Sequence, residues 1–209
     1  MNVSMKTKII CFLLIVFCQG IGVASAAIFD HPMNASSKQD VKKSLVKMMD
    51  HDVVSGDFTQ TKTFKKSNRK FVSTGNFRIS KASGIVWKTI KPVYSELIVT
   101  DESVTERLAN GQVNTISTKD NPIFSDISKT VLALLSGDVA KLESKINIFY
   151  EKTPNGVQIG LVPREIMVQM MVANLVMSIS SNLDRVVITD GEGSLMTFDF
   201  KNYKNSGKK

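Results

Sequence analysis

The chain has little of what most enzyme active sites require. Its 209 residues include two cysteines and two histidines. Both cysteines, Cys11 and Cys18, lie in the first 26 residues, so a chain without that segment would have no disulfide, thiolate nucleophile or zinc–cysteine site. We interpret His31 and His51 as surface groups, and no phosphate or dinucleotide motif is present. These absences argue against an enzyme, and we expect no cofactor and no metal.

Long apolar runs are also missing. Two lysines precede a short apolar run at residues 9–17, and residues 24–26 (Ala-Ser-Ala) form a typical cleavage site. Residues 1–26 are therefore predicted to be a cleaved signal peptide, and the protein is expected in the periplasm. Lipid attachment at Cys18 is the weaker alternative, because the three residues before it lack small side chains.

Acidic residues are outnumbered, 19 to 27, which gives a net charge of +8. This excess suits contact with anionic lipid or an acidic partner, whereas nucleic acid is not expected outside the cytoplasm. Four lysines fall in residues 201–209, which we expect to be a basic flexible tail. A second basic run is either a solvated turn or a docking patch for a membrane or partner transporter. Its members are Lys62, Lys65, Lys66, Arg69 and Lys70.

The two-residue period of β-strands is abundant. Between residues 69 and 80, Phe71, Gly75, Phe77 and Ile79 share one side and polar residues occupy the other. A hairpin signal, Asn-Gly at residues 110–111, marks one of the turns. Strands are expected at residues 54–64, 69–80, 84–91, 94–101, 103–109, 112–118, 145–152, 157–162, 174–181, 185–189 and 194–200.

Two segments have helical spacing instead. Val41, Leu45 and Met48 predict a helix of about four turns that starts near Ser36. The second helix is predicted from an N-cap at Ser125 to a stop at Gly137, with Ile127, Val131, Leu134 and Leu135 on one face. Residues 164–171 fit either a short helix or another strand.

About eleven strands, two or three helices and no β-α-β alternation predict a mainly β, α+β fold. We expect a curled antiparallel sheet that forms an incomplete β-barrel, with an apolar concave side covered by lid helices. No repeat or linker divides residues 27–209, so we expect one domain and a monomer.

Several short motifs occur in an order that resembles the outer-membrane lipoprotein carrier family, LolA and its LolA-like relatives. The resemblance covers nearly the whole chain after the signal peptide, although each motif alone is weak. The motifs are Gly56-Asp57-Phe58-Thr59-Gln60, Ser73-x-Gly75-x-Phe77, Gly84-x-x-Trp87 followed by Pro92, Asn121-Pro122-Ile123-Phe124 and Leu161-Val162-Pro163.

The resemblance implies a periplasmic carrier that binds acyl chains of a lipoprotein or other lipid in a hydrophobic cavity. Such a carrier shuttles its cargo toward the outer membrane, between an inner-membrane transporter and an outer-membrane acceptor. Trp87 and the methionines could equally be ordinary core residues. The side chains expected to line the cavity are Phe58, Phe77, Trp87, Ile98, Ile127, Val131, Leu134, Met167, Met171 and Met177.

Two departures from the family pattern favour a LolA-like branch over the lipoprotein carrier proper. Lys81 stands nearest to the arginine that holds the family's lid closed, and a lysine contact is less directional. The usual Asp-Gly turn is replaced at residues 101–103. A glycolipid or other lipid cargo is therefore an alternative to a lipoprotein. A further rival is a non-catalytic interaction or structural protein whose barrel is filled by its own side chains.

Overall fold

The computed structural model describes residues 27–48, 50–67, 69–80, 82–117, 119–120 and 122–208. Within these ranges, a few side chains are left out of the description: Pro122, Ile123, Phe124, Asp126, Ile127, Leu135 and Lys208. The predicted signal peptide at residues 1–26 and the predicted lid contact Lys81 lie outside the described residues, as does the Ile127 side chain.

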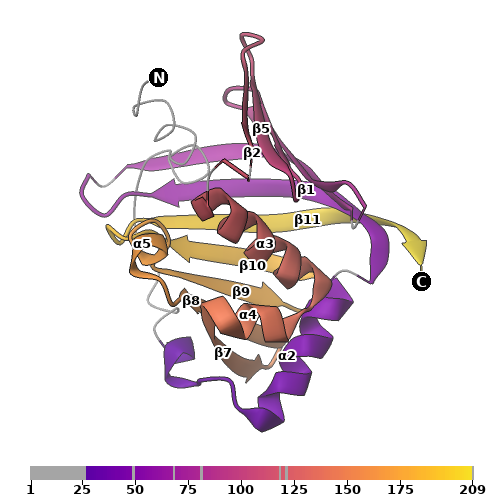
Figure 1. The fold of residues 1–209 in the computed structure, drawn as a ribbon, viewed down its shortest axis with the longest axis vertical. Coiled ribbons are helices and arrows are strands. Elements are labelled where there is room, and N and C mark those ends of the chain that lie inside the picture. The colour runs from indigo at the N-terminus through magenta and orange to yellow at the C-terminus, as the bar shows by residue number, and fades with distance from the viewer. Residues whose placement is uncertain are drawn as a thin grey trace.

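Eleven strands form one antiparallel sheet that is not closed into a barrel. Neighbouring strands pair in the order β6-β5-β4-β3-β2-β1-β11-β10-β9-β8-β7. Figure 1 shows that β5 and its neighbours turn away from the plane of β7 to β11, so the sheet is strongly curled. The strands are β1 (His51–Thr63), β2 (Lys70–Ser80), β3 (Gly84–Lys91), β4 (Ser95–Val99), β5 (Ser103–Leu108), β6 (Val113–Ser117), β7 (Ile146–Thr153), β8 (Gly156–Pro163), β9 (Asn174–Ile179), β10 (Leu183–Thr189) and β11 (Leu195–Lys208). The predicted fold class is confirmed.

The pairing of β1 with β11 joins the two halves of the chain. It runs from His51 opposite Lys208 to Thr63 opposite Leu195, with a bulge between Ser55 and Asp57. The prediction of a flexible tail at residues 201–209 is therefore wrong for residues 201–208. Their backbone groups are paired in the sheet. β11 extends to Lys208 because its partner β1 begins at His51, earlier than the predicted start at residue 54.

Helices cover one face of the sheet. α2 (Ala35–Met48), α3 (Pro122–Ser136) and α4 (Val139–Lys145) lie over β7 to β10 (Figure 1). Asn34 caps α2, since its Oδ1 accepts hydrogen bonds from the amides of Ser36 and Ser37 at 3.0 Å. The chain also contains η1 (Ala27–Asp30) and α5 (Ile166–Gln169).

The second helix prediction needs two corrections. The helix starts at Pro122, a favoured first helical position, rather than after Ser125. Gly137 ends it with φ of 67°, as predicted, but the chain then enters α4. Asp138 caps α4 by accepting the amide of Lys141. In the open segment 164–171, the structure forms the short α5.

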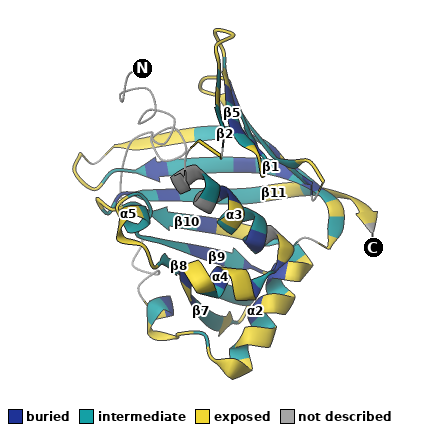
Figure 2. Cartoon of the chain, viewed as in Figure 1, coloured by how far each residue is buried: buried dark blue, intermediate teal, exposed yellow. Residues whose placement is uncertain are grey.

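The core has one large centre beneath the helices and smaller ones along the sheet. Val41 and Leu45 of α2 and Leu142 of α4 pack on buried residues of the sheet such as Ile159 and Met177. In Figure 2, the exposed residues of α2 and α4 lie on their outer faces. The helices are therefore amphipathic covers for the sheet.

Candidate functional site

The register of the strands defines which side chains face the concave side. Phe77 pairs with Trp87, Trp87 with Leu97, and Leu97 with Glu106. Because paired residues point to the same face of a sheet, these four form one row. Glu106 is buried, with 4% of its surface exposed.

An aromatic cluster fills the concave side around Trp87. The indole stacks on Phe58 with ring centroids 3.9 Å apart, and Phe198 meets it edge-on at 5.3 Å. Phe77 packs edge-on against Phe200 at 5.3 Å. Phe58 and Phe77 are 1% and 3% exposed. This part of the concave face is occupied by the protein's own side chains.

An apolar cavity of about 140 Å³ lies elsewhere, between α3 and the sheet. Its walls come from α3, the start of β7, the end of β8, the segment around α5, and β9. That volume is close to the cavity of about 150 Å³ that binds benzene in an apolar protein core. The lining residues are Thr130, Val131, Leu134, Lys145, Ile146, Leu161, Pro163, Glu165, Val168, Val172 and Leu175.

Charge is confined to one ion pair at this cavity. The Nζ of Lys145 lies 3.0 Å from Oε1 of Glu165, and the two side chains are 46% and 52% exposed. They therefore lie at the border with solvent. Among the lining side chains that the structure describes, Thr130 is the one other polar group. The arrangement provides an apolar interior with a charged rim, which suits an amphipathic ligand.

The predicted cavity residues fall in different places. Val131 and Leu134 line the cavity. Met177 is buried in the core, and Phe58, Phe77 and Trp87 form the aromatic cluster. Met167 is 63% exposed, and Met171 is half-buried outside the cavity lining.

Ile98 lies on the other face of the sheet. It neighbours Leu97, which shares the concave face with Trp87, and it pairs with Val86 and Thr105. Adjacent residues of a strand point to opposite faces, so Ile98 cannot share a concave cavity with Trp87. Assigning it to the cavity was wrong, because the sequence pattern did not fix the register of β4.

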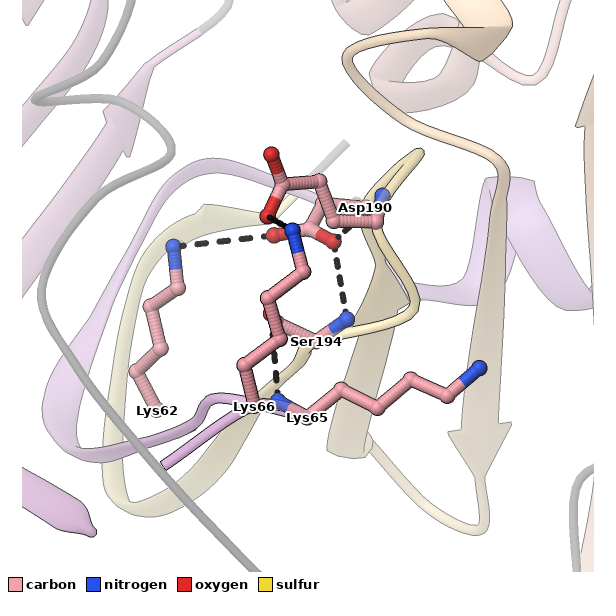
Figure 3. A network of polar contacts seen from close by, with 6 residues as sticks. Lys62, Lys65, Lys66, Asp190 and Ser194 are labelled. Carbon is pink, nitrogen blue, oxygen red and sulfur yellow. Dashed lines mark hydrogen bonds and ion pairs between the residues drawn. The ribbon is translucent and has the colours of Figure 1, made fainter. Parts of the chain in front are cut away.

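Lys62 is buried, so it does not belong to an exposed docking patch. Its side chain is 3% exposed, and its Nζ lies 3.9 Å from Oδ2 of Asp190 (Figure 3) and 5.1 Å from the Phe64 ring centroid. The alternation of β1 turns Lys62 to the same face as Phe58. The exposed members of the basic run are Lys65, Lys66, Arg69 and Lys70.

The sequence prediction missed the contribution of α5 and its flanks. Val168 and Val172 are four residues apart, which places both on one side of a helical turn facing the cavity. That spacing is visible in the sequence. The isoleucine and methionines around the two valines hide this helical spacing, because a segment in which most residues are apolar fits a strand as well as a helix.

A groove of about 900 Å³ lies on the opposite face, lined by charged residues such as Asp57, Arg78, Lys88 and Glu96 together with apolar and aromatic ones such as Val86 and Tyr203. Glu96 is buried and accepts from Lys88 and Arg107, each at 3.0 Å. Lys88 in the first place, and Arg107 with it, hold the pKa of the Glu96 carboxyl below its usual value, against the effect of burial. This network is complete within the protein.

Metal and membrane signals are absent from the described part of the chain. No group of three His, Cys, Asp or Glu side chains there could hold a metal ion. Among the same residues, no helix has the length and apolar character needed to cross a membrane.

A curled, open antiparallel sheet with helices over one face defines a LolA-like fold. The model of the family "Outer membrane lipoprotein carrier protein LolA" matches residues 50–208. The chain therefore belongs to the LolA family. This confirms the resemblance seen in the sequence.

The solved structures to which this chain is similar are distant in sequence. A LolA superfamily protein from Nitrosomonas europaea is 8% identical, with a TM-score of 0.47, 85% of this chain and 96% of that chain covered. A DUF1329 family protein from Desulfovibrio piger is 10% identical, with a TM-score of 0.45, 81% of this chain and 92% of that one covered. LprF from Mycobacterium bovis is 12% identical, with a TM-score of 0.38 and coverage of 83% and 94%. No curated protein sequence matches the chain. The family assignment rests on residues 50–208.

Proposed function

We propose that this protein is a periplasmic carrier that binds an acyl chain of a lipid or lipoprotein in the cavity beneath α3. The observation that carries the proposal is the cavity between α3, α5 and β8, whose interior is apolar and whose rim holds Lys145 and Glu165. Membership of a family described as lipoprotein carriers supports it.

The cavity in this form admits only the end of one chain, since about 140 Å³ is the size of a small aromatic molecule. A longer chain requires α3 and α5 to move away from the sheet. Each buried CH₂ contributes about 0.8 kcal/mol, so a long chain supplies about 10 kcal/mol before ordering costs. This gain is large enough to offset a local opening of the helices.

Binding in this mechanism is non-covalent. The apolar wall takes the chain, while the charged rim stays in contact with solvent and the polar headgroup. Release requires a partner that offers a better apolar environment. We infer that the carrier is a monomer and that its partners are an inner-membrane donor and an outer-membrane acceptor. We also infer that residues 1–26 act as a signal peptide, which directs export and is then cleaved.

The test is binding of a fluorescent fatty acid by the purified protein, with native mass spectrometry for lipid that copurifies. Val168→Trp, which fills the cavity from α5, is expected to weaken binding at least tenfold. Val113→Trp is the matched control, because Val113 is 56% exposed on β6, away from the cavity. Leu134→Trp fills the same cavity from α3, and urea unfolding checks that each variant is folded.

A second function has one observation in its favour. The aromatic cluster around Trp87 already fills part of the concave face, as in an interaction protein with a filled barrel. If no lipid copurifies and no fatty acid binds, the carrier proposal fails and this second function takes its place.

A further inference from the structure

The short helix α5 exposes large apolar side chains. Ile166, Met167 and Met170 are 74%, 63% and 68% exposed, the three highest values among the exposed large hydrophobic residues apart from Val93 at 65%. Three such side chains within five residues form a patch, whereas single exposed apolar residues are normal. Such a patch marks a surface that contacts lipid or another protein.

A basic hairpin lies next to this patch. The turn at residues 190–194 stands between α5 and the connection from β1 to β2. On one side, the backbone of Gly191 packs against the carbonyl of Met170. On the other, Lys66 pairs with Glu192 at 3.3 Å, and the amide of Lys65 donates to Ser194 Oγ at 3.4 Å (Figure 3). Figure 1 shows α5 and the β1–β2 hairpin at the same end of the molecule.

The charge of this end is mainly basic, although Glu165 and Glu192 are also exposed there. Lys65, Lys66, Arg69 and Lys70 are exposed, and no acidic residue occurs between Phe58 and Ser95. Glu192 offsets part of the charge, but its pair with Lys66 is highly exposed, at 69% and 80%, and is therefore weak. Exposed apolar side chains flanked by lysine and arginine are typical of segments that bind anionic bilayer surfaces.

We propose that this end of the protein docks on the surface of an anionic phospholipid bilayer. In the docked state Ile166, Met167 and Met170 enter the interface, and the basic hairpin contacts lipid phosphates. These seven residues, the four basic ones and the three apolar ones, are the docking end. The charge complementarity favours lipid over a protein partner, because a protein groove for α5 would not need four cations beside it.

Docking at this end also affects the cavity, a consequence that rests on the proposed function. Val168 and Val172 line the cavity from the same segment that carries the exposed methionines. Insertion of Met167 and Met170 into the bilayer surface therefore pulls on the segment that forms one wall of the cavity. It also brings the rim of the cavity to the lipid headgroups. Contacts that tie the segment to the rest of the protein include the Gln169 Nε2 hydrogen bond to the Pro163 carbonyl, the Ala173 amide hydrogen bond to the Thr189 carbonyl and the Lys145–Glu165 ion pair.

The test is flotation of the purified protein with two kinds of vesicle, phosphatidylcholine alone and phosphatidylcholine mixed with an equal amount of phosphatidylglycerol. We expect binding to the mixed vesicles alone, and weaker binding at higher salt. Arg69→Gln is expected to weaken it about fivefold. Met167→Glu is expected to weaken it at least tenfold, because a carboxylate resists entry into the interface.

Val113→Glu is the matched control, since it adds the same charge at an exposed valine of β6. Equal losses from Met167→Glu and Val113→Glu, no binding to either vesicle, or equal binding to both would overturn the docking proposal. Fatty-acid binding without vesicles separates it from the carrier proposal, because Met167→Glu should leave that binding unchanged. A protein that binds fatty acid but no vesicle would disprove docking and leave the carrier function standing.

Discussion

The ring of Trp87 on β3 stacks on Phe58 of β1, with centroids 3.9 Å apart, although β2 lies between these two strands. The contact is possible because the residue between them, paired with Phe58, is Gly75. The two large rings meet above a position with no side chain. Trp87, which is partly buried, therefore packs on the core of the curled half of the sheet.

Replacing Trp87 should reduce stability more than it reduces ligand binding. Trp87→Ala removes a stacked ring from a packed cluster, and we expect the free energy of unfolding to fall by about 3–5 kcal/mol. Urea unfolding measures this loss, and Trp87→Phe, which keeps a ring, should lose less. The folded fraction of Trp87→Ala should bind fatty acid nearly as well as the parent. Normal stability with lost binding would instead make Trp87 a ligand contact.

Gly75 should not tolerate a methyl group. A β-carbon there would clash with the carbonyl of Lys88 and would lie 2.8 Å from the Phe58 ring. Neither the sheet backbone nor the stacked ring can shift easily, so we expect Gly75→Ala to cost about 3 kcal/mol, the upper end for overpacking. The unfolding midpoint in urea measures it. At an open strand site Gly→Ala is usually stabilising, by about 0.5–1 kcal/mol. A loss below about 1 kcal/mol would therefore show that the cluster is loosely packed.

The fold could largely be predicted from the sequence, because its strands alternate strongly and their turns contain Gly and Asn. Turns such as 110–111 and 155–156 set the hairpin lengths, and these set the order of strands. The cavity could be predicted only in part. Val131 and Leu134 were predicted correctly, because they lie on the apolar face of α3. Placing Ile98 on the correct face of the sheet required the register of β4, which the pattern of side chains alone did not determine.

Other errors have a similar physical origin. Lys62 looked like a surface residue because lysine is rarely buried, and only the pairing of β1 with β11 brings Asp190 near it. Residues 201–208 have the composition of a free tail, yet a long partner strand satisfies their backbone groups. Both outcomes depend on contacts between residues more than a hundred positions apart, which a local pattern does not contain.

The pair formed by buried Lys62 and half-buried Asp190 gives an asymmetric prediction. Asp190→Ala leaves a buried lysine without this carboxylate and removes the hydrogen bonds that Asp190 Oδ1 accepts from the amides of Glu192 and Ser194. We expect a loss of about 3 kcal/mol in the free energy of unfolding. Lys62→Met keeps the volume and removes the charge, so it should cost less than about 1 kcal/mol. Equal losses in urea unfolding would show that the lysine charge itself stabilises the fold.

Glu96 makes the fold sensitive to acid. Lys88, and then Arg107, hold the pKa of its carboxyl below the usual 4.5 in the folded protein. The folded state therefore binds fewer protons than the unfolded state, so the stabilisation is complete above about pH 4.5 and is lost as pH falls below it. We expect Glu96→Gln to be less stable than the parent at pH 7 and to lose less stability on acidification. Urea midpoints at several pH values measure the difference. Parallel curves for the two proteins would contradict the assignment.

Lys145 at the cavity rim should distinguish between headgroups. Lys145→Glu places a second carboxylate beside Glu165, where the polar end of a bound chain would lie. A fatty-acid anion is then repelled, whereas a fatty alcohol of the same length is not. Because the rim is exposed, we expect about a fivefold loss of affinity for the acid and little change for the alcohol, measured by displacement of a fluorescent fatty acid. Lys119→Glu, an exposed lysine before α3, controls for net charge. Equal losses for acid and alcohol would place the headgroup away from Lys145.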